Sequence, residues 1–382
     1  MPFPLVQQLP GPVDDGPQGL LAVVDWSWEL LDERERTLLR EVSVFAGGWE
    51  LEAAEAVCTG PAAELLGALV DKSLIVATPC ERDGSDGMRY RLLETIHEYA
   101  VERAAERPEL RAAAELRHRA WVRALVEEAE PQLRSAGQLP WISRLETELD
   151  NIRAAVDRTL TASDEAQAGD LVLAMGWFWW LRNYRREGMT WVDRILRLGV
   201  ALDHLRSDGE AEDPIDAYLA APHTETNHPA HRRRMNLRML HLFLKAETEP
   251  MDGDLDPRLR RYVELVRNHF AQGGPDAARL PGIVWPMIGL TLKEPVDIRP
   301  LMDASVAHCR THGDDWAVAT ALMLRTHMVV DSPGGLTGVD DDLDELRVLS
   351  RLVGDRWLRA QVSSAAGEAA MARGRPAAAK EE

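Results

Sequence analysis

The densest group of potential metal ligands in the sequence consists of His223, Glu225, His228 and His231. Imidazole and carboxylate groups are ligands that zinc and related ions accept. A metal site also needs outer hydrogen bonds that orient each ligand, and a segment interrupted by prolines rarely supplies them. We therefore expect a solvated polar loop at these positions, with a metal site as the less favoured alternative.

A second acidic group, formed by Asp252, Asp254 and Asp256, resembles the opening of a calcium-binding loop. Such a loop needs glycine at its sixth position and a bidentate glutamate at its twelfth. Pro257 and Val263 stand at those positions here. Calcium binding is therefore not expected.

Motifs for nucleotide or acyl chemistry are absent from the sequence. It contains no G-x-x-x-x-G-K-[ST], no G-x-G-x-x-G after a predicted strand, no G-x-S-x-G and no H-E-x-x-H. Backbone N–H groups of glycine-rich loops are what cradle phosphates, so this absence argues against ATP hydrolysis. Glu94, His97 and Glu98 fall within one turn of a predicted helix, where packing or solvation is the simpler explanation. We expect no enzymatic activity, and we assign no catalytic, metal-binding or cofactor-binding residue.

Aromatic and basic side chains offer the best candidates for binding. The sequence holds 12 tryptophans, and Trp177-Phe178-Trp179-Trp180 is their densest cluster. Adjacent residues of a helix point in different directions, so these rings cannot all face one core. Core packing is the favoured explanation, and a binding groove is the alternative, because aromatic and arginine side chains commonly anchor interfaces. The candidate interaction surface comprises Trp177, Trp179, Trp180, Arg182, Tyr184, Arg185 and Arg186.

A basic cluster at His231-Arg232-Arg233-Arg234, with Arg238, could contact an acidic partner or nucleic acid. No aromatic residues interleave with it to stack on bases, so a solvated helix start is the favoured interpretation. The chain as a whole carries a formal net charge of -19, which repels a phosphate backbone. Direct nucleic-acid binding is not expected.

Composition places the chain among globular proteins. With 382 residues, 45% hydrophobic and 28% charged, it is long enough for two or three domains. Cys58, Cys80 and Cys309 lie far apart, which suggests neither a disulfide framework nor a thiolate zinc site. No segment has the pattern of a signal peptide or the roughly 20 apolar residues of a membrane span. We expect a cytoplasmic protein without a membrane partner.

The first part of the chain has the pattern of a small winged-helix domain. Residues 1–18 are rich in Pro, Gly and Asp, which predicts a disordered leader. Apolar residues at helical spacing, then β-prone runs, predict helices near 20–31, 38–42, 52–57 and 62–70 and strands at 73–77 and 88–92. The glycine-rich stretch 83–87 suits a hairpin turn. We expect a winged-helix domain with one β-hairpin over 19–107, in which Gly47-Gly48 end the second helix.

The rest of the chain predicts helices in antiparallel pairs. A first helical-repeat segment is expected at 108–202, a linker or insertion at 203–231, and further repeats at 232–382. Gly313-Asp314-Asp315-Trp316-Ala317 recurs as Gly354-Asp355-Arg356-Trp357-Leu358, an offset that fits two helices and a loop per unit. The predicted fold class is mostly α, with the winged-helix domain followed by a tetratricopeptide-like α-solenoid.

Several stretches resemble AfsR/SARP-type and LuxR-type transcriptional regulators of actinomycetes, members of the signal-transducing NTPase class. The resemblance covers residues 20 to 200 densely. It is carried by Asp25-Trp26-Ser27-Trp28-Glu29-Leu30-Leu31, the runs 38–48 and 69–74, Arg89 to Ala100, Trp141 to Ala155, and Trp177 to Arg182.

The resemblance implies a division of labour. In such regulators an NTPase module is a nucleotide-gated switch, a winged helix closes on the nucleotide, helical repeats sense a ligand or partner, and a separate domain binds DNA. This chain has counterparts of the winged helix and the repeats, and no P-loop. Related NTPases often carry a Met-His-Asp triplet whose histidine approaches the phosphate, and Leu92-Leu93-Glu94 stands there instead.

These patterns lead to one hypothesis and one alternative. The hypothesis is a non-enzymatic regulatory region of a bacterial transcriptional regulator. Its repeats bind a protein or small effector and act on NTPase and DNA-binding modules of a full-length regulator. The alternative is a stand-alone tetratricopeptide-like adaptor that competes with, or scaffolds, a full-length regulator.

Overall fold

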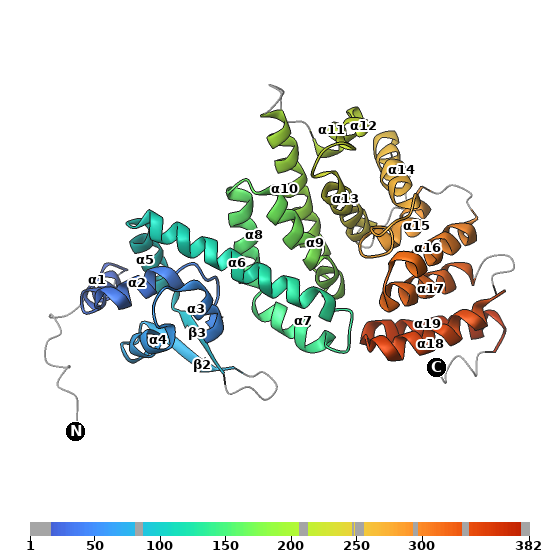
Figure 1. Cartoon of the computed structure of the whole chain (residues 1–382). Helices are drawn as coiled ribbons and strands as arrows, with labels where there is room; N and C mark the ends of the chain where they lie inside the picture. The colour runs from blue at the N-terminus through green and yellow to red at the C-terminus, as the bar shows by residue number, and fades with distance from the viewer. Residues whose placement is uncertain are drawn as a thin grey trace. The chain divides into compact units, whose positions relative to one another are not determined.

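The computed structural model describes residues 17–80, 87–205, 213–246, 248, 256–292, 297–330 and 336–375 (Figure 1). Residues 1–16 of the expected leader, the turn residues 83–86, and Asp252 and Asp254 lie outside these ranges. The chain is mostly helical, with a small antiparallel sheet.

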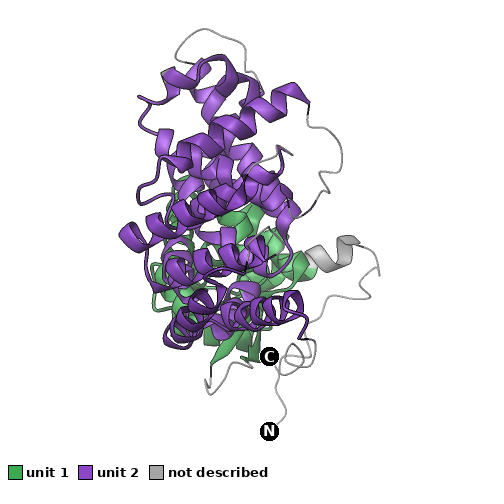
Figure 2. Cartoon of the chain, turned by 90° about the vertical axis from the view of Figure 1, so that its right-hand side faces the viewer, with its two compact units in different colours: residues 1–122, 148–155 green, residues 123–147, 156–382 purple. Residues whose placement is uncertain are grey.

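Two compact units divide the chain (Figure 2). Unit 1 comprises residues 1–122 and 148–155, and unit 2 comprises 123–147 and 156–382. The division falls inside two helices, α6 (Pro108–Gln132) and α8 (Leu149–Thr161). The sequence-based boundary at residue 107 therefore differs from this division, because parts of α6 and α8 pack with the first unit.

Unit 1 alternates helices with three short strands. Its strands pair in the order β1-β3-β2, and β2 and β3 form an antiparallel hairpin in which Ile75 faces Leu92. The elements that precede α6 are α1 (Pro17–Glu29), α2 (Glu33–Val42), β1 (Trp49–Glu50), α3 (Leu51–Val57), α4 (Ala62–Asp71), β2 (Ile75–Pro79), β3 (Met88–Leu92) and α5 (Glu94–Ala105). The predicted hairpin and the helices at 52–57 and 62–70 are confirmed.

The polar residues Asp32 and Glu35 form a capping box at the start of the second helix, α2. Asp32 accepts a hydrogen bond from the Glu35 backbone N–H at 2.8 Å, and the Glu35 carboxylate accepts one from the Asp32 N–H at 2.9 Å. The helix ends at Val42, so the expectation that Gly47-Gly48 end it is wrong. Gly48 instead permits close strand pairing, since a Cβ there would lie 2.8 Å from the Tyr90 carbonyl oxygen.

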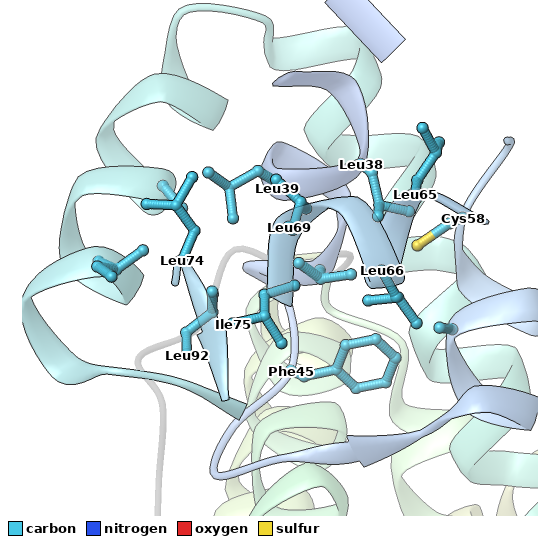
Figure 3. Close-up of a cluster of buried hydrophobic side chains, with 14 of the residues drawn as sticks. Leu38, Leu39, Phe45, Cys58, Leu65, Leu66, Leu69, Leu74, Ile75 and Leu92 are labelled. Carbon is cyan, nitrogen blue, oxygen red and sulfur yellow. The ribbon is translucent and has the colours of Figure 1, made fainter. Parts of the chain in front are cut away.

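The core of unit 1 lies among its helices and the hairpin. Leu38 and Leu39 of α2 meet Leu69 of α4 and Ile75 of β2 in this core (Figure 3). Phe45 stacks on Trp49, with ring centres 5.1 Å apart. The apolar periodicity of the sequence therefore corresponds to the faces of these helices that are buried in the core.

Residues 148–155 join unit 1 through polar contacts. The Asn151 side chain accepts a hydrogen bond from the Ala46 N–H and donates one to the Gly48 carbonyl, each at 2.8 Å. Glu148 is buried and pairs with Arg89 at 2.5 Å. These contacts assign the start of α8 to the first unit.

Unit 2 consists of helices that pack on their neighbours in the chain. α13 packs against both α9 and α10, and α19 packs against both α17 and α18. Its elements after α6 and around α8 are α7 (Gln138–Thr147), α9 (Glu165–Leu181), α10 (Arg185–His204), α11 (Pro214–Ala220), α12 (Pro222–Glu225), α13 (His231–Ala246), α14 (Pro257–Ala271), η2 (Gly282–Val284), α15 (Trp285–Leu290), α16 (Ile298–His312), α17 (Asp315–Val329), α18 (Val339–Val353) and α19 (Arg356–Ala372).

The segment 203–231, expected to be a linker or insertion, contains helices α11 and α12. Pro214 and Pro222 each stand at the first position of a helix. Proline is favourable there because the N–H that it lacks would have no partner within the helix. Asp213 caps α11 by accepting a hydrogen bond from the Ile215 N–H at 2.9 Å. These prolines therefore start helices.

Within the described ranges, no single helix combines the length and apolarity that crossing a membrane requires. The bent pair α3 and α4, at 116°, satisfies those criteria only when its two helices are joined. The apolar residues of that pair, such as Leu66 and Leu69, lie in the core of unit 1.

Candidate functional site: an aromatic pocket

The tryptophan cluster of α9 divides between the core and a pocket. Trp177 and Trp180 line the pocket, whereas Trp179 is only 1% exposed and packs in the core. A Cβ at Gly188 of α10 would lie 2.9 Å from the Trp179 ring, which shows how closely the two helices approach. Trp179 is therefore a packing residue, and its place in the candidate interaction surface is corrected.

The other candidate surface residues lie at the turn between α9 and α10. Arg182 is exposed and pairs with Glu146 at 2.6 Å. Tyr184 stacks on Phe178, and Arg186 is exposed. Arg185 lies over the Trp180 ring, 5.5 Å from its centre. Of the basic and tyrosine positions, only Arg185 thus touches a ring that lines the pocket.

Two further tryptophans, Trp316 and Trp357, complete an aromatic cluster with Trp177 and Trp180. Trp177 and Trp180 are three residues apart on α9 and stack in parallel, with ring centres 4.7 Å apart. Trp357 meets both edge-on, at 4.9 and 5.3 Å, and Trp316 lies 5.6 Å from Trp177. Phe243 of α13 stacks on Trp180. Offset and edge-on contacts at such distances are favourable for aromatic rings.

The sequence repeat explains how Trp316 and Trp357 are positioned. Asp314 caps α17 and Asp355 caps α19, so each tryptophan is the second residue of its helix. Asp355 is fully buried, and it accepts hydrogen bonds from the Trp316 Nε1–H at 2.7 Å and the Gln138 Nε2–H at 2.8 Å. Burial raises the pKa of Asp355, against the effect of these donors. The second copy of the motif therefore orients the tryptophan of the first.

The pocket encloses ≈ 460 Å³, a volume in the range of small-molecule sites. Most of its wall is apolar or aromatic, and three methionines add adaptable surface. Its lining residues are Trp177, Trp180, Phe243, Leu280, Val284, Met287, Trp316, Thr320, Met323, Leu324, His327, Met328, Trp357, Gln361, Ser364 and Glu368.

Polar atoms of the lining lack hydrogen-bond partners. Among the described residues, the Nε1 atoms of Trp177 and Trp180, Oγ1 of Thr320 and Nε2 of His327 are buried without one. Such atoms are costly to bury, and native proteins satisfy most of them. His327 Nδ1 lies 2.6 Å from the Glu368 carboxylate. If Nδ1 carries the proton that this contact needs, Nε2 of a neutral imidazole is an acceptor.

A second hollow, of ≈ 470 Å³, has charged walls that are already paired. Arg233 pairs with Asp170 at 2.7 Å. Arg232 pairs with Asp276 at 2.7 Å, and Arg279 pairs with the same carboxylate. Each of these three arginines therefore already has a carboxylate partner within the chain, with Asp276 shared by two of them.

Two arginines of the basic cluster, Arg234 and Arg238, are buried, contrary to the interpretation of a solvated helix start, whereas the Arg232 side chain is 64% exposed. Arg234 is buried and pairs with Glu165 and Asp203, each at 2.6 Å. Arg238 is 2% exposed, pairs with Glu225 and lies 4.0 Å from the centre of the Tyr218 ring. The segment that forms α11 and α12 supplies both the carboxylate and the ring. Its packing on α13 buries arginines that sequence alone places at the surface.

The histidine group belongs to the same packed region. His228 Nε2 lies 3.3 Å from Asp203, and His231 stacks edge-on against His269 at 5.2 Å. Burial lowers the pKa of both His231 and His269. His223 is exposed. In the ranges that the structure describes, no group of three or more His, Cys, Asp or Glu side chains could hold a metal ion.

Sequence analysis missed the residues that turn a tryptophan cluster into a pocket. Trp316 and Trp357 appeared in it only as marks of a repeat, and Phe243 and His327 gave no signal of their own. The usable signal was that the repeat places a tryptophan at the same helix position twice. Aromatic residues at equivalent positions of stacked helices lie on one face.

Comparison with known proteins relates this chain to transcriptional regulators. It is 36% identical over 185 residues to proteins of Mycobacterium tuberculosis (strain H37Rv) and Mycobacterium bovis that are provisionally named HTH-type transcriptional regulators. An uncharacterized protein of Mycobacterium tuberculosis is 40% identical over 96 residues, which are 23% of each chain. This similarity supports a regulatory role in general.

The similarity to the named regulators covers 47% of this chain and only 20% of their own length. No protein-family model and no solved structure matches the chain.

Proposed function

We propose that this chain is a non-enzymatic regulatory region of a bacterial transcriptional regulator, of the AfsR/SARP and LuxR-like kind. Its tetratricopeptide-like helical repeats bind a small effector or a protein partner and thereby control an NTPase switch that this chain does not contain. The aromatic pocket between α9, α13, α17 and α19 is the observation that carries the proposal. It has the volume of an effector site, and its wall holds unsatisfied polar atoms.

For unit 1 we propose a winged helix with a regulatory role. The order of helices followed by the β2–β3 hairpin fits that fold. A helix that enters the major groove presents side chains to bases and phosphates, chiefly arginine and lysine. The helix before the hairpin, α4, has the sequence AAELLGALVD, with Glu64 and Asp71 and no basic residue. This composition supports a role other than direct DNA contact.

The geometry around His327 favours binding over catalysis. Ser364 and Glu368 lie near it and superficially suggest a hydrolytic triad. In such a triad the serine hydroxyl contacts the histidine base. Here Ser364 Oγ donates a hydrogen bond to the Glu368 carboxylate at 3.4 Å, and not to His327. The same carboxylate is also the partner of His327. The serine is thus paired with the carboxylate and gains no base from this arrangement.

A chromosomal experiment tests the proposal. The coding sequence is deleted in the native host, or changed to Trp357→Ala, and transcripts are sequenced at equal protein abundance. We expect the deletion and Trp357→Ala to change an overlapping set of transcripts. Trp191→Ala is the matched control, because Trp191 lies on α10, pairs with Arg194 at 4.7 Å and does not line the pocket. The proposal fails if the deletion changes no transcripts, or if Trp357→Ala behaves as wild type.

A further inference from the structure

The pocket has two chemically different ends. Trp316 and Trp357 lie at the start of α17 and α19, and His327 and Glu368 lie near the ends of the same helices. The Trp316–Asp355 contact joins the two starts, and the His327–Glu368 contact joins the two ends. The helices therefore run in parallel along the pocket. His327 follows Trp316 by eleven positions on α17, which corresponds to about 16 Å of helix.

One end of the pocket is aromatic. The four tryptophans and Phe243 gather where α17 and α19 begin. Their π faces are electron-rich and attract organic cations as well as flat apolar groups. Arg185 over the Trp180 ring shows that this cluster already accepts a guanidinium on one face.

The other end of the pocket is acidic. Glu368 is the acidic residue of the lining, and no lysine or arginine lines the pocket among the described residues. Its carboxylate already contacts His327 and Ser364, but its side chain is 48% exposed, so a ligand can reach it beside these contacts. The C-terminal ends of α17 and α19 lie on the same side and add negative partial charge. An ammonium group at this position would meet both the carboxylate and these helix ends.

We infer that the pocket binds an elongated organic cation. Its amine lies against Glu368, and its apolar or aromatic body extends between α17 and α19 toward the tryptophans. Met323 lies between Trp316 and His327 on α17, and it lines the pocket together with Met287 and Met328, whose flexible side chains can adapt to the shape of the body. This inference rests on the proposed function, because it names the chemical class of the effector that the pocket would sense.

A matched ligand series tests the charge requirement. Purified full chain is titrated by calorimetry at pH 7.5 with 4-phenylbutylamine, 4-phenylbutanol and 4-phenylbutyrate, which share one body and differ in charge. We expect the amine to bind at least about tenfold more tightly than the alcohol, and the carboxylate to bind most weakly.

Two variants locate the effect. Glu368→Gln should reduce amine affinity to about that of the alcohol and leave alcohol binding unchanged. Glu368→Lys should reverse the order in favour of 4-phenylbutyrate. Glu345→Gln is the matched control, since Glu345 lies on α18, pairs with Arg310 and does not line the pocket. Far-ultraviolet circular dichroism checks that each variant keeps its helices.

Three results would overturn the inference: equal affinities for amine and alcohol, an amine affinity that Glu368→Gln leaves unchanged, or no binding of the amine at millimolar concentration. None of them decides the proposed function, which the transcript experiment with Trp357→Ala tests without any chosen ligand. A failure of the charge requirement is therefore distinguishable from a failure of the regulatory role.

Discussion

Two hollows of nearly equal volume in unit 2 differ in whether the polar side chains that line them have partners within the chain. The charged hollow, ≈ 470 Å³, is rich in arginine, and each of Arg232 and Arg233 has a carboxylate partner in the chain. The aromatic pocket, ≈ 460 Å³, contains few polar groups, yet Trp177 Nε1 and His327 Nε2 lack partners among the described residues. The two hollows therefore differ in whether their polar side-chain atoms are satisfied within the chain, and in the part of the chain that the structure describes only the aromatic pocket leaves some of them available to a ligand.

The largest expected effect concerns the region around the charged hollow. Arg234→Ala should lower the free energy of unfolding of unit 2 by about 3–5 kcal/mol, because it leaves the Glu165 side chain, only 11% exposed, without its partner. The Arg234 side chain is 5% exposed. Urea unfolding followed by tryptophan fluorescence measures the loss.

Arg232→Ala is the matched control for that prediction. Its side chain is 64% exposed, so the loss should be only about 0–1 kcal/mol. Equal small losses for the two variants would mean that the cluster is solvated. The burial of Arg234 in its ion pairs beside the charged hollow would then be contradicted.

The second largest expected effect is a difference in stability loss between variants at the two helix-capping aspartates beside the aromatic pocket. Asp355→Ala should cost about 3 kcal/mol, because it removes a helix cap and leaves the Trp316 and Gln138 donors without an acceptor. Asp314→Ala should lower the free energy of unfolding by only about 1 kcal/mol, since Asp314 is exposed and its side chain caps α17 by accepting a hydrogen bond from the Ala317 N–H. Equal costs in thermal or urea unfolding would show that Asp355 does not position Trp316.

The smallest expected effect is a pH dependence of the stability of unit 2, which arises from His231 and His269. Burial lowers the folded-state pKa of His231 and His269 below 6.5, so the unfolded chain binds more protons there. Stability should therefore be full above pH 6.5 and fall as the pH is lowered toward the folded-state pKa. His269→Gln should weaken this dependence, and His223→Gln, at an exposed site, should not. Urea midpoints between pH 7.5 and 5.5 test the sign, and a rise in stability on acidification would contradict it.

Much of the fold could be predicted from local patterns. Apolar periodicity predicts the helices of unit 1, and a glycine-rich stretch between β-prone runs predicts the β2–β3 hairpin. The two-residue strand β1 is too short for any periodicity to reveal. The expected linker or insertion at 203–231 contains Pro214 and Pro222, and proline at a first helical position equally marks a helix start.

The buried arginines and the aromatic pocket were harder to predict because they depend on contacts between residues far apart in the sequence. Arg238 is buried only because α11 and α12 bring Glu225 and Tyr218 to it. Trp177 and Trp357 lie far apart in the sequence, and only stacking of the helices makes them neighbours. The sequence therefore indicates that the chain is rich in tryptophan, but it does not indicate which tryptophans line the same pocket.

The most direct test of the account is native mass spectrometry of the chain isolated gently from its own host. If the aromatic pocket is an effector site, the wild-type chain and Trp191→Ala should carry the same small-molecule adduct, and Trp357→Ala should lose it. If Trp357→Ala keeps the adduct, or if the wild-type chain carries none, the pocket is not the site of a resident effector and the central claim is contradicted.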